Sequence, residues 1–527
     1  MADKETFDLV EDAPGVHNVQ TGKMEQDAAA RGTQRETELT VLAALKYYKK
    51  AVMWSLAISM ATIMESYDLI LINSFFAHPQ FQKKFGQPLN NGTGGYTLST
   101  QWQIGLSMAG LVGLIPGVFA NGILVDRYGY RKVMAASHIF LIGAIFGTFF
   151  ASSAAVLTVG VILISLPCGV FAAATPGYAA EVCPMALRGY LTTYVNLCWV
   201  MGHLIGAGVL IAKLKDPTEW SYRLPFAIQW IWPPFLAVAC WFAPESPWWL
   251  VRQNRLEDAR KTMDRILDAP EGTLNKDDII AMMDHTIQTE RAMEIGGSYL
   301  DCFRGTNLRR TEIAMISWGC QILPGFAIQN YSTYFFTMAG LSSNDSFKMT
   351  LGNYSIAFTG TVLSWFIQTR FGRRQIYLAG LTAMLPLMAT VGFLDLAPPS
   401  ASIRWAQSGL LLTWFFCYGS TIGPIPFAIA AEVGASRLRT KTISLGRNTY
   451  YFLSVVNTVV APYMLNPTAG NLKGKAAFPA FGLTVILLVW TFFRLPETKG
   501  LTPETLDHLF HQRVPARKFK EEAKHFQ

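Results

Sequence analysis

Two acidic residues and one arginine interrupt stretches of the chain that are otherwise apolar. Glu65 and Asp68 lie three residues apart within one hydrophobic run, so they would share a face of a helix. Arg447 lies in another apolar run, near the C-terminal end. A charge inside a bilayer is costly, so such residues face a partner or a wet path and often carry protons. We therefore expect these residues to handle protons, with Arg447 as a partner of Glu65 or Asp68; a purely structural ion pair is the alternative.

The composition places these charges in a membrane protein. Of the 527 residues, 51% are hydrophobic and only 15% are charged, whereas soluble domains carry about 25% charged residues. Apolar runs of roughly 20 residues are long enough to cross a bilayer as helices. Such runs begin near residues 51, 103, 133, 156, 190, 226, 312, 351, 375, 404, 442 and 477. The sequence therefore predicts an all-α membrane protein with about twelve transmembrane helices.

Three motifs in the first half of the chain return in the second half at nearly one offset. The motifs at 126–132, 181–188 and 244–246 correspond to those at 369–374, 432–439 and 496–498 (369 − 126 = 243, 432 − 181 = 251, 496 − 244 = 252). A duplicated set of spans is typical of transporters that rock around a central site. We therefore expect two six-helix bundles.

The repeated motifs concentrate opposite charges on short loops. Such charges can pair with neighbouring helix ends when one side of a transporter is closed. We expect Glu181 with Arg188, and Glu432 with Arg439, to act as clamps of this kind. Basic loop residues that only hold the orientation of the chain are the alternative. The expected gating residues are Asp126, Arg127, Arg131, Glu181, Arg188, Glu245, Arg370, Glu432, Arg439 and Glu497.

Lys and Arg are denser in the loops on the side of the two termini than in the loops on the other side. This bias places both termini in the cytoplasm. It also accounts for the net charge of +8, which therefore does not indicate nucleic-acid binding. The expected organisation is a cytoplasmic tail at 1–50, a first bundle at 51–243, a cytoplasmic linker of amphipathic helices at 244–311, a second bundle at 312–494 and a cytoplasmic tail at 495–527.

Several motifs resemble those of a known transporter family. They are Asp126-Arg127-Tyr128-Gly129, Arg188–Trp199, Leu224–Trp232, Pro244–Leu250, Tyr331–Phe336, Leu438–Thr442, Pro496–Gly500 and Val514–Phe519. They are similar to motifs of the sugar porters in the major facilitator superfamily and, more narrowly, of the fungal maltose and general α-glucoside permeases. The resemblance implies import of an α-glucoside such as maltose by proton symport through alternating access.

A sugar site needs polar groups for the hydroxyls and aromatic faces for the C–H surface. The side chains that meet this need by position are Asn196, His203, Gln321, Gln329, Asn330, Tyr331, Phe427, Asn448, Tyr450 and Tyr451. Some of these would instead pack helices together. The chain departs from the permeases at positions such as His203, where they have glutamine. Transport of a hexose, polyol or secondary metabolite, and uncoupled transport, therefore stay open as alternatives; a transporter-like nutrient sensor is less favoured.

Other classes of function find little support in the sequence. We see no removable signal peptide, no arrangement of residues typical of an enzyme, and no spacing that indicates a metal or another cofactor. Asn91, in Asn91-Gly92-Thr93, lies in the longest expected outer loop and is a possible glycosylation acceptor. We expect a multi-pass plasma-membrane protein whose partners are a sugar, protons and the lipid bilayer, and which functions as a monomer.

Overall fold

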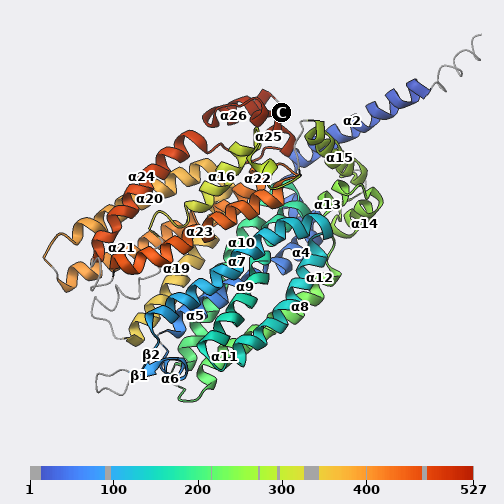
Figure 1. The fold of residues 1–527 in the computed structure, drawn as a ribbon. Helices are drawn as coiled ribbons and strands as arrows, with labels where there is room; N and C mark the ends of the chain where they lie inside the picture. The colour runs from blue at the N-terminus through green and yellow to red at the C-terminus, as the bar shows by residue number, and fades with distance from the viewer. Residues whose placement is uncertain are drawn as a thin grey trace, which may run out of the picture.

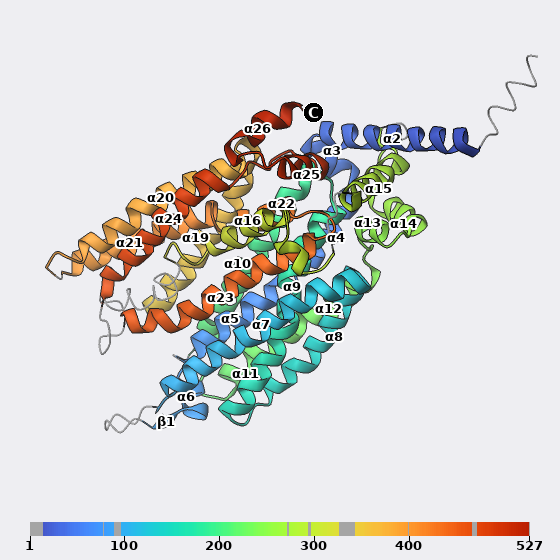
Figure 2. The same cartoon turned by 45° about the horizontal axis from the view of Figure 1, so that its top comes forward.

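Two helical bundles lie side by side and are connected at one end by a helical segment (Figure 1). This computed structural model describes residues 14–76, 78–88, 96–214, 216–270, 273–292, 297–325, 343–398, 400–465 and 472–525. The N-terminal helix α2 and the C-terminal helix α25 both lie at the connected end (Figures 1 and 2). We call this end the terminal side.

The first bundle begins with a span that is broken near its middle, because α4 ends at Ser59 and α5 begins at Thr62. The helices that follow are apolar on every face, as expected for helices that contact both lipid and protein. The bundle consists of α4 (Lys49–Ser59), α5 (Thr62–Phe75), α7 (Thr100–Tyr128), α8 (Tyr130–Phe149), α9 (Ala154–Val182), α10 (Met185–Lys213), α11 (Trp220–Ile228), η1 (Gln229–Ile231) and α12 (Trp232–Phe242).

The second bundle also contains a broken span. Here α21 ends at Ser420 and α22 begins at Ile425, so the helix is interrupted at Gly423-Pro424, where the sequence predicts a bend. The bundle consists of α16 (Asn307–Gly319), α19 (Ser343–Arg370), α20 (Arg373–Leu394), α21 (Ala401–Ser420), α22 (Ile425–Val433), α23 (Arg439–Leu465), η3 (Lys473–Ala476) and α24 (Ala477–Arg494).

Segments outside the bundles gather mainly at the terminal side, where α2 packs along α15 (Figure 2). These segments are α2 (Pro14–Glu38), α3 (Val41–Tyr47), α13 (Pro247–Arg252), α14 (Leu256–Ile266), α15 (Lys276–Ala292), η2 (Leu300–Phe303), α25 (Pro503–His511), η4 (Ala516–Lys518), α26 (Phe519–Glu522) and η5 (Ala523–His525). The opposite side carries α6 (Pro79–Phe85) and the antiparallel pair β1 (Gln87–Pro88) and β2 (Tyr96–Thr97).

The helices have the length and surface of membrane spans. Within the described ranges, nine helical stretches are long and apolar enough to cross a bilayer. The spans predicted to begin near residues 312, 351 and 442 overlap α16, α19 and α23, which are not among these nine stretches. Large apolar side chains such as Phe235 and Ile486 are 70% and 64% exposed, as expected for a surface covered by lipid. The prediction of an all-α membrane protein is confirmed.

Candidate functional site

A buried ion pair joins the two bundles at the level of the membrane. Arg447 on α23 donates through Nη2 to Oε1 of Glu65 on α5, and the Tyr451 hydroxyl donates to the same oxygen at 2.5 Å. The Arg447 Nε also donates to the Tyr451 hydroxyl, at 3.1 Å. Glu65 and Arg447 are only 1% and 2% exposed. The pairing expected for Arg447 is therefore present, and its partner is Glu65 rather than Asp68.

Aromatic rings surround the Arg447 guanidinium. Its Cζ lies 4.8 Å from the ring centroids of Trp318, Tyr450 and Tyr451 and 5.8 Å from that of Phe427. Aromatic faces attract cations, more strongly where water is excluded, so these rings help to hold a charge far from solvent. The hydrogen bonding of Glu65 is incomplete, because its Oε2 is buried without a hydrogen-bond partner among the described residues. This second oxygen can therefore accept a further hydrogen bond.

Asp68 lies one turn further along α5 and has a separate partner. The amide of Gln229, on η1 of the same bundle, donates to Asp68 Oδ1 at 3.0 Å. Gln229 is completely buried and is not among the site residues expected from the sequence. The signal that was available is its place in the Leu224–Trp232 motif, which carried the family resemblance.

Two of the expected sugar-binding residues lie on α10 and face the second bundle. The Asn196 amide donates to the Thr361 hydroxyl of α19 at 3.3 Å. The His203 ring lies near Trp199 of its own helix and Tyr354 of α19, at centroid distances of 4.1 and 4.9 Å, and is tilted against both rings. Both residues therefore belong to the seam between the bundles, where a solute would pass.

Four more of these residues lie in the second bundle, on α22 and α23 and just after α16. Asn448 is 1% exposed, and both polar atoms of its amide lack a hydrogen-bond partner in the described chain. Gln321 donates to the Gly423 carbonyl at 2.5 Å, at the break between α21 and α22. Phe427 packs edge-on against Trp318, and Tyr450 packs edge-on against Tyr451. The remaining expected residues, Gln329, Asn330 and Tyr331, and the glycosylation candidate Asn91, lie outside the described residues.

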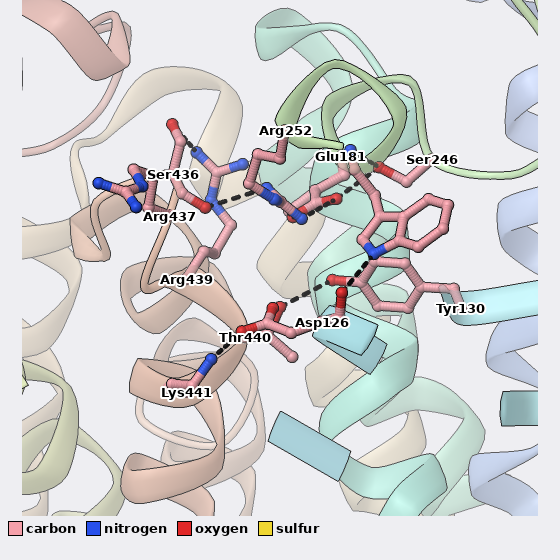
Figure 3. Close-up of polar contacts among 12 residues, drawn as sticks. Asp126, Tyr130, Glu181, Ser246, Arg252, Ser436, Arg437, Arg439, Thr440 and Lys441 are labelled. Atoms are coloured by element: carbon pink, nitrogen blue, oxygen red, sulfur yellow. Dashed lines mark hydrogen bonds and ion pairs between the residues drawn. The ribbon is translucent and has the colours of Figure 1, made fainter. Parts of the chain in front are cut away.

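The repeated motifs form two carboxylate clusters at the terminal side. In the first cluster, Glu181 at the end of α9 accepts from the Ser246 hydroxyl and pairs with Arg252 at 3.0 Å (Figure 3). In the second cluster, Glu432 at the end of α22 accepts from the Thr498 hydroxyl at 2.6 Å and pairs with Arg373 at 2.8 Å. Ser246 and Thr498 occupy equivalent positions of the repeat (498 − 246 = 252).

These pairs correct two expectations from the sequence. Glu181 does not pair with Arg188, whose Nε instead donates to the Ala180 carbonyl at 2.9 Å, at the end of the preceding helix. Glu432 does not pair with Arg439, which lies over the Trp248 ring at 5.5 Å and donates to the Ser436 hydroxyl. In both places, an arginine from a different element lies nearer to the carboxylate.

The two bundles also meet directly at the terminal side. Asp126 at the end of α7 forms an ion pair with Lys441 near the start of α23, and the Tyr130 and Thr440 hydroxyls are 3.3 Å apart (Figure 3). The three other basic residues expected to gate are not paired with a carboxylate in the described chain. Arg127 lies over Tyr128 and Arg131 over Trp241, and Arg370 lies in the last turn of α19.

Glu245 and Glu497 cap the helices that follow the repeated loops. Glu245 accepts from the Tyr130 and Arg131 amides at 2.9 and 3.3 Å, and Glu497 accepts from the Arg373 amide at 2.8 Å. Carboxylates at a helix N-terminus are stabilised by the free N–H groups and by the helix dipole. Burial nevertheless raises the pKa of Glu245 to about 7, against the effect of these hydrogen bonds.

Comparison with known proteins identifies the family. The model of the "Sugar (and other) transporter" family matches residues 54–510. The chain is 39% identical over 498 residues to the general alpha-glucoside permease of Saccharomyces cerevisiae, covering 94% of this chain and 80% of that protein. It is also 39% identical over 497 residues to the maltose permease MAL31 of the same yeast, covering 93% and 81%.

Solved structures of the proton:xylose symporter XylE share the fold. The form bound to 6-bromo-6-deoxy-D-glucose gives a TM-score of 0.74 at 18% identity and covers 88% of this chain and 100% of that one. An inward-open form from E. coli gives a TM-score of 0.61 at 18% identity, covering 86% and 98%. The protein therefore shares the fold of these symporters and belongs to the "Sugar (and other) transporter" family, and it is a transporter rather than an enzyme.

Proposed function

We propose that the protein imports an α-glucoside such as maltose together with protons, by alternating access. The observation that carries this proposal is the buried bridge of Glu65, Arg447 and Tyr451, which joins the two bundles within the membrane. The names of the relatives support the choice of solute, since they are α-glucoside and maltose permeases. The symporter with the same fold supports the choice of the proton as the coupled ion.

Glu65 is the proton-binding group in this mechanism. When Glu65 is ionised, its attraction to Arg447 holds the two bundles together at mid-membrane. Protonation cancels this attraction, because a neutral carboxyl no longer pairs with the guanidinium, and the bundles are then free to separate. Asp68, held by Gln229, is the second acidic group on the same helix face and serves the same proton path.

The solute binds beside this bridge. Asn448 follows Arg447 in the chain and has a buried amide without a partner among the described residues, so it suits a sugar hydroxyl. The rings of Phe427, Tyr450 and Tyr451 provide faces for the C–H surface of the sugar. A solute that binds Asn448 also contacts the residue next to Arg447, which links sugar binding to the state of the ion pair.

Opening toward the terminal side requires specific contacts to break. They include the Asp126–Lys441 ion pair and the hydrogen bond from Arg252 to the Ser436 carbonyl, at 3.0 Å. Because these contacts hold one side closed, they act as a gate whose partners exchange between states. We keep the other gating residues expected from the sequence in this role, but Arg252 and Arg373 replace Arg188 and Arg439 as the arginines that pair with Glu181 and Glu432.

We place the terminal side in the cytoplasm and the protein in the plasma membrane, following the distribution of Lys and Arg. We propose the same order of tails, bundles and linker as expected from the sequence, with the first bundle beginning at Lys49 and the second at Asn307. In this orientation the loop that contains Asn91 belongs to the outer side, so we keep Asn91 as the proposed glycosylation acceptor, and we propose that a single chain suffices for transport.

The test is uptake of radiolabelled maltose by yeast cells that lack their own α-glucoside permeases. We expect the protein to accumulate maltose above the outside concentration and a protonophore to abolish this accumulation.

Arg447→Ala should abolish accumulation, and Arg304→Ala, which removes an exposed arginine of the linker, is the control. Accumulation by Arg447→Ala equal to that of the wild type would contradict the mechanism. Uptake of a hexose or polyol in place of maltose would show that the proposed solute is wrong. Maltose uptake that the protonophore does not change would indicate an uncoupled facilitator.

A further inference from the structure

Two arginines converge on one aromatic ring at the edge of the membrane. Arg374, the second residue of α20, lies 5.6 Å from the ring centroid of Phe492, and Arg517 of the C-terminal tail lies 5.2 Å from the same centroid. Arg374 also donates to the Phe492 carbonyl at 2.8 Å. Arg517 additionally lies 5.3 Å from the Phe493 ring. The two positive charges therefore come from separate elements and meet at the end of α24.

Neither arginine of this pair forms an ion pair within the described ranges. The Glu497 carboxylate attracts the Arg374 guanidinium, but it already accepts from the Arg373 amide, and the two guanidinium groups repel each other electrostatically. Guanidinium groups bind phosphate through parallel N–H···O bonds, so two of them at one place suit a shared phosphate group. A bound anion would remove the repulsion between the two arginines.

An apolar track leads from this pair into the membrane region. Phe492 and Phe493 are 42% and 55% exposed, at the end of a helix that is apolar enough to span a bilayer. Ile486 and Val489 are 64% and 53% exposed, and together with Phe493 they recur at spacings of three and four residues on one face of α24. A positive site at the end of such a face matches a molecule with a negative head and a long apolar tail.

We propose that Arg374 and Arg517 bind the headgroup phosphate of an anionic phospholipid whose acyl chain lies along the exposed face of α24. The proposal rests on the orientation given above, because the cytoplasmic leaflet is the one rich in anionic lipids.

The site also gives a role to the C-terminal motif Val514–Phe519. Phe519 is fully buried, packs against Phe510 at 5.1 Å and so fixes the short η4 helix that carries Arg517. Arg309 of α16 donates to the Val514 carbonyl at 2.7 Å and holds the start of the motif. The motif therefore presents Arg517 to the membrane, and a lipid bound there would tie the tail to α20 and α24.

The experiment is native mass spectrometry of the full chain in detergent, titrated with dioctanoyl phosphatidic acid or with dioctanoyl phosphatidylcholine. We expect the wild type to prefer phosphatidic acid, and Arg374→Gln/Arg517→Gln to weaken its binding by roughly tenfold or more, from the contribution of each arginine near an anionic lipid. Arg374→Lys/Arg517→Lys keeps the charge and should retain part of the binding. Lys261→Gln/Arg304→Gln removes the same charge from exposed linker positions and should bind as the wild type does.

Three results would overturn the proposal. They are equal binding of phosphatidic acid by the wild type and the double glutamine variant, an equal loss in the linker control, and competition by millimolar inorganic phosphate as effective as that by the lipid. The last result would identify the anion as free phosphate rather than a lipid. An unchanged thermal unfolding midpoint without added lipid shows that the glutamine variant is folded. Because binding is measured without transport, failure of the lipid site is distinguishable from failure of the proposed symport.

Discussion

The two carboxylate clusters at the terminal side use the same chemistry but obtain their arginine from different places. In the second bundle, Arg373 comes from the repeated loop itself and pairs with Glu432. The equivalent position of the first bundle is Tyr130 (373 − 243 = 130), and the arginine paired with Glu181 is Arg252 on α13 of the linker. The first cluster is therefore completed by a residue outside the bundle that it stabilises.

This difference shows that the linker takes part in holding the terminal side closed. Arg252 donates to the Ser436 carbonyl as well as to Glu181, so one side chain contacts both bundles. Glu290 of α15 accepts from the Ser436 and Arg437 amides at 2.6 and 3.0 Å and holds the same turn of the second bundle. In the described chain, the Arg373 guanidinium by contrast donates only to Glu432 of its own bundle, although it lies against Gly189 of the first bundle.

Among the variants that test the difference between the two carboxylate clusters, Arg252→Ala should have the largest effect. It leaves Glu181, whose side chain is 0% exposed, as an unpaired buried charge, which costs about 3 to 5 kcal/mol. It also removes a contact between the bundles, so the terminal side should open more often. Both effects are measured together, by thermal unfolding and by the rate at which the buried Cys183 reacts with N-ethylmaleimide.

Arg373→Ala is the matched variant in the second bundle. It should also lower the unfolding midpoint but leave the reactivity of Cys183 near that of the wild type, because the Arg252 contact between the bundles remains. Equal acceleration of Cys183 labelling by the two variants would contradict the asymmetry between the clusters.

Gly129→Ala should lower the free energy of unfolding more than Gly372→Ala does. A side chain at either position would collide with the carboxylate of the capping residue, Glu245 or Glu497. Gly129, however, also has φ of 85° and ψ of 164°, a conformation that is essentially restricted to glycine and adds about 1 to 3 kcal/mol, whereas Gly372 has an ordinary φ of −80°. Thermal unfolding of both variants checks this order; the reverse order would show that the collision outweighs the backbone strain.

Glu245 should contribute to the pH dependence of the stability of the folded protein. Because burial raises its pKa from 4.5 to about 7, the folded protein binds this proton more tightly than the unfolded chain does. The contribution of Glu245 to the free energy of unfolding is therefore fully present below about pH 4.5. It falls by at most about 1.4 kcal/mol per pH unit between about pH 4.5 and pH 7, and it changes no further above about pH 7. Unfolding midpoints from pH 4 to pH 8 should fall less steeply with rising pH for Glu245→Gln than for the wild type. Glu257→Gln controls for the lost charge, and identical slopes for all three proteins would contradict the assignment.

The ion pair between Asp126 and Lys441 should give the smallest effect. The Asp126 side chain is 29% exposed, so solvent weakens the pair to about 1 kcal/mol or less. The second bundle has Thr369 at the equivalent position, so it lacks this carboxylate. A double-mutant cycle of Asp126→Asn and Lys441→Met should give a coupling energy of about 0.5 to 1 kcal/mol, whereas strictly additive single effects would show that the pair contributes nothing.

The sequence predicted those features that depend on composition and repetition. Apolar runs of sufficient length predicted the spans, and Gly423-Pro424 predicted the break between α21 and α22. The offsets of 243 to 252 predicted matching loops. An arginine and an acid in separate apolar runs were enough to predict that Arg447 has an acidic partner, because neither charge is stable alone in a membrane.

The choice of partners could not be predicted, because it depends on how separate elements pack. Arg188 and Arg439 lie seven residues from Glu181 and Glu432 in the sequence, yet the loops turn them away from these carboxylates. Arg252 reaches Glu181 only because α13 folds back under the first bundle. Gln229 is paired with Asp68 across 161 residues, a contact that a single sequence does not reveal.

The most direct test of the proposed mechanism is coupled transport in proteoliposomes that contain the purified protein. Internal pH and radiolabelled maltose would be followed together, with and without an imposed proton gradient, for the wild type and for Glu65→Gln. We expect the wild type to move protons inward with maltose and to accumulate the sugar. Glu65→Gln should exchange maltose across the membrane without accumulating it and without moving protons. Gradient-driven accumulation of maltose by Glu65→Gln would contradict the role assigned to the buried pair.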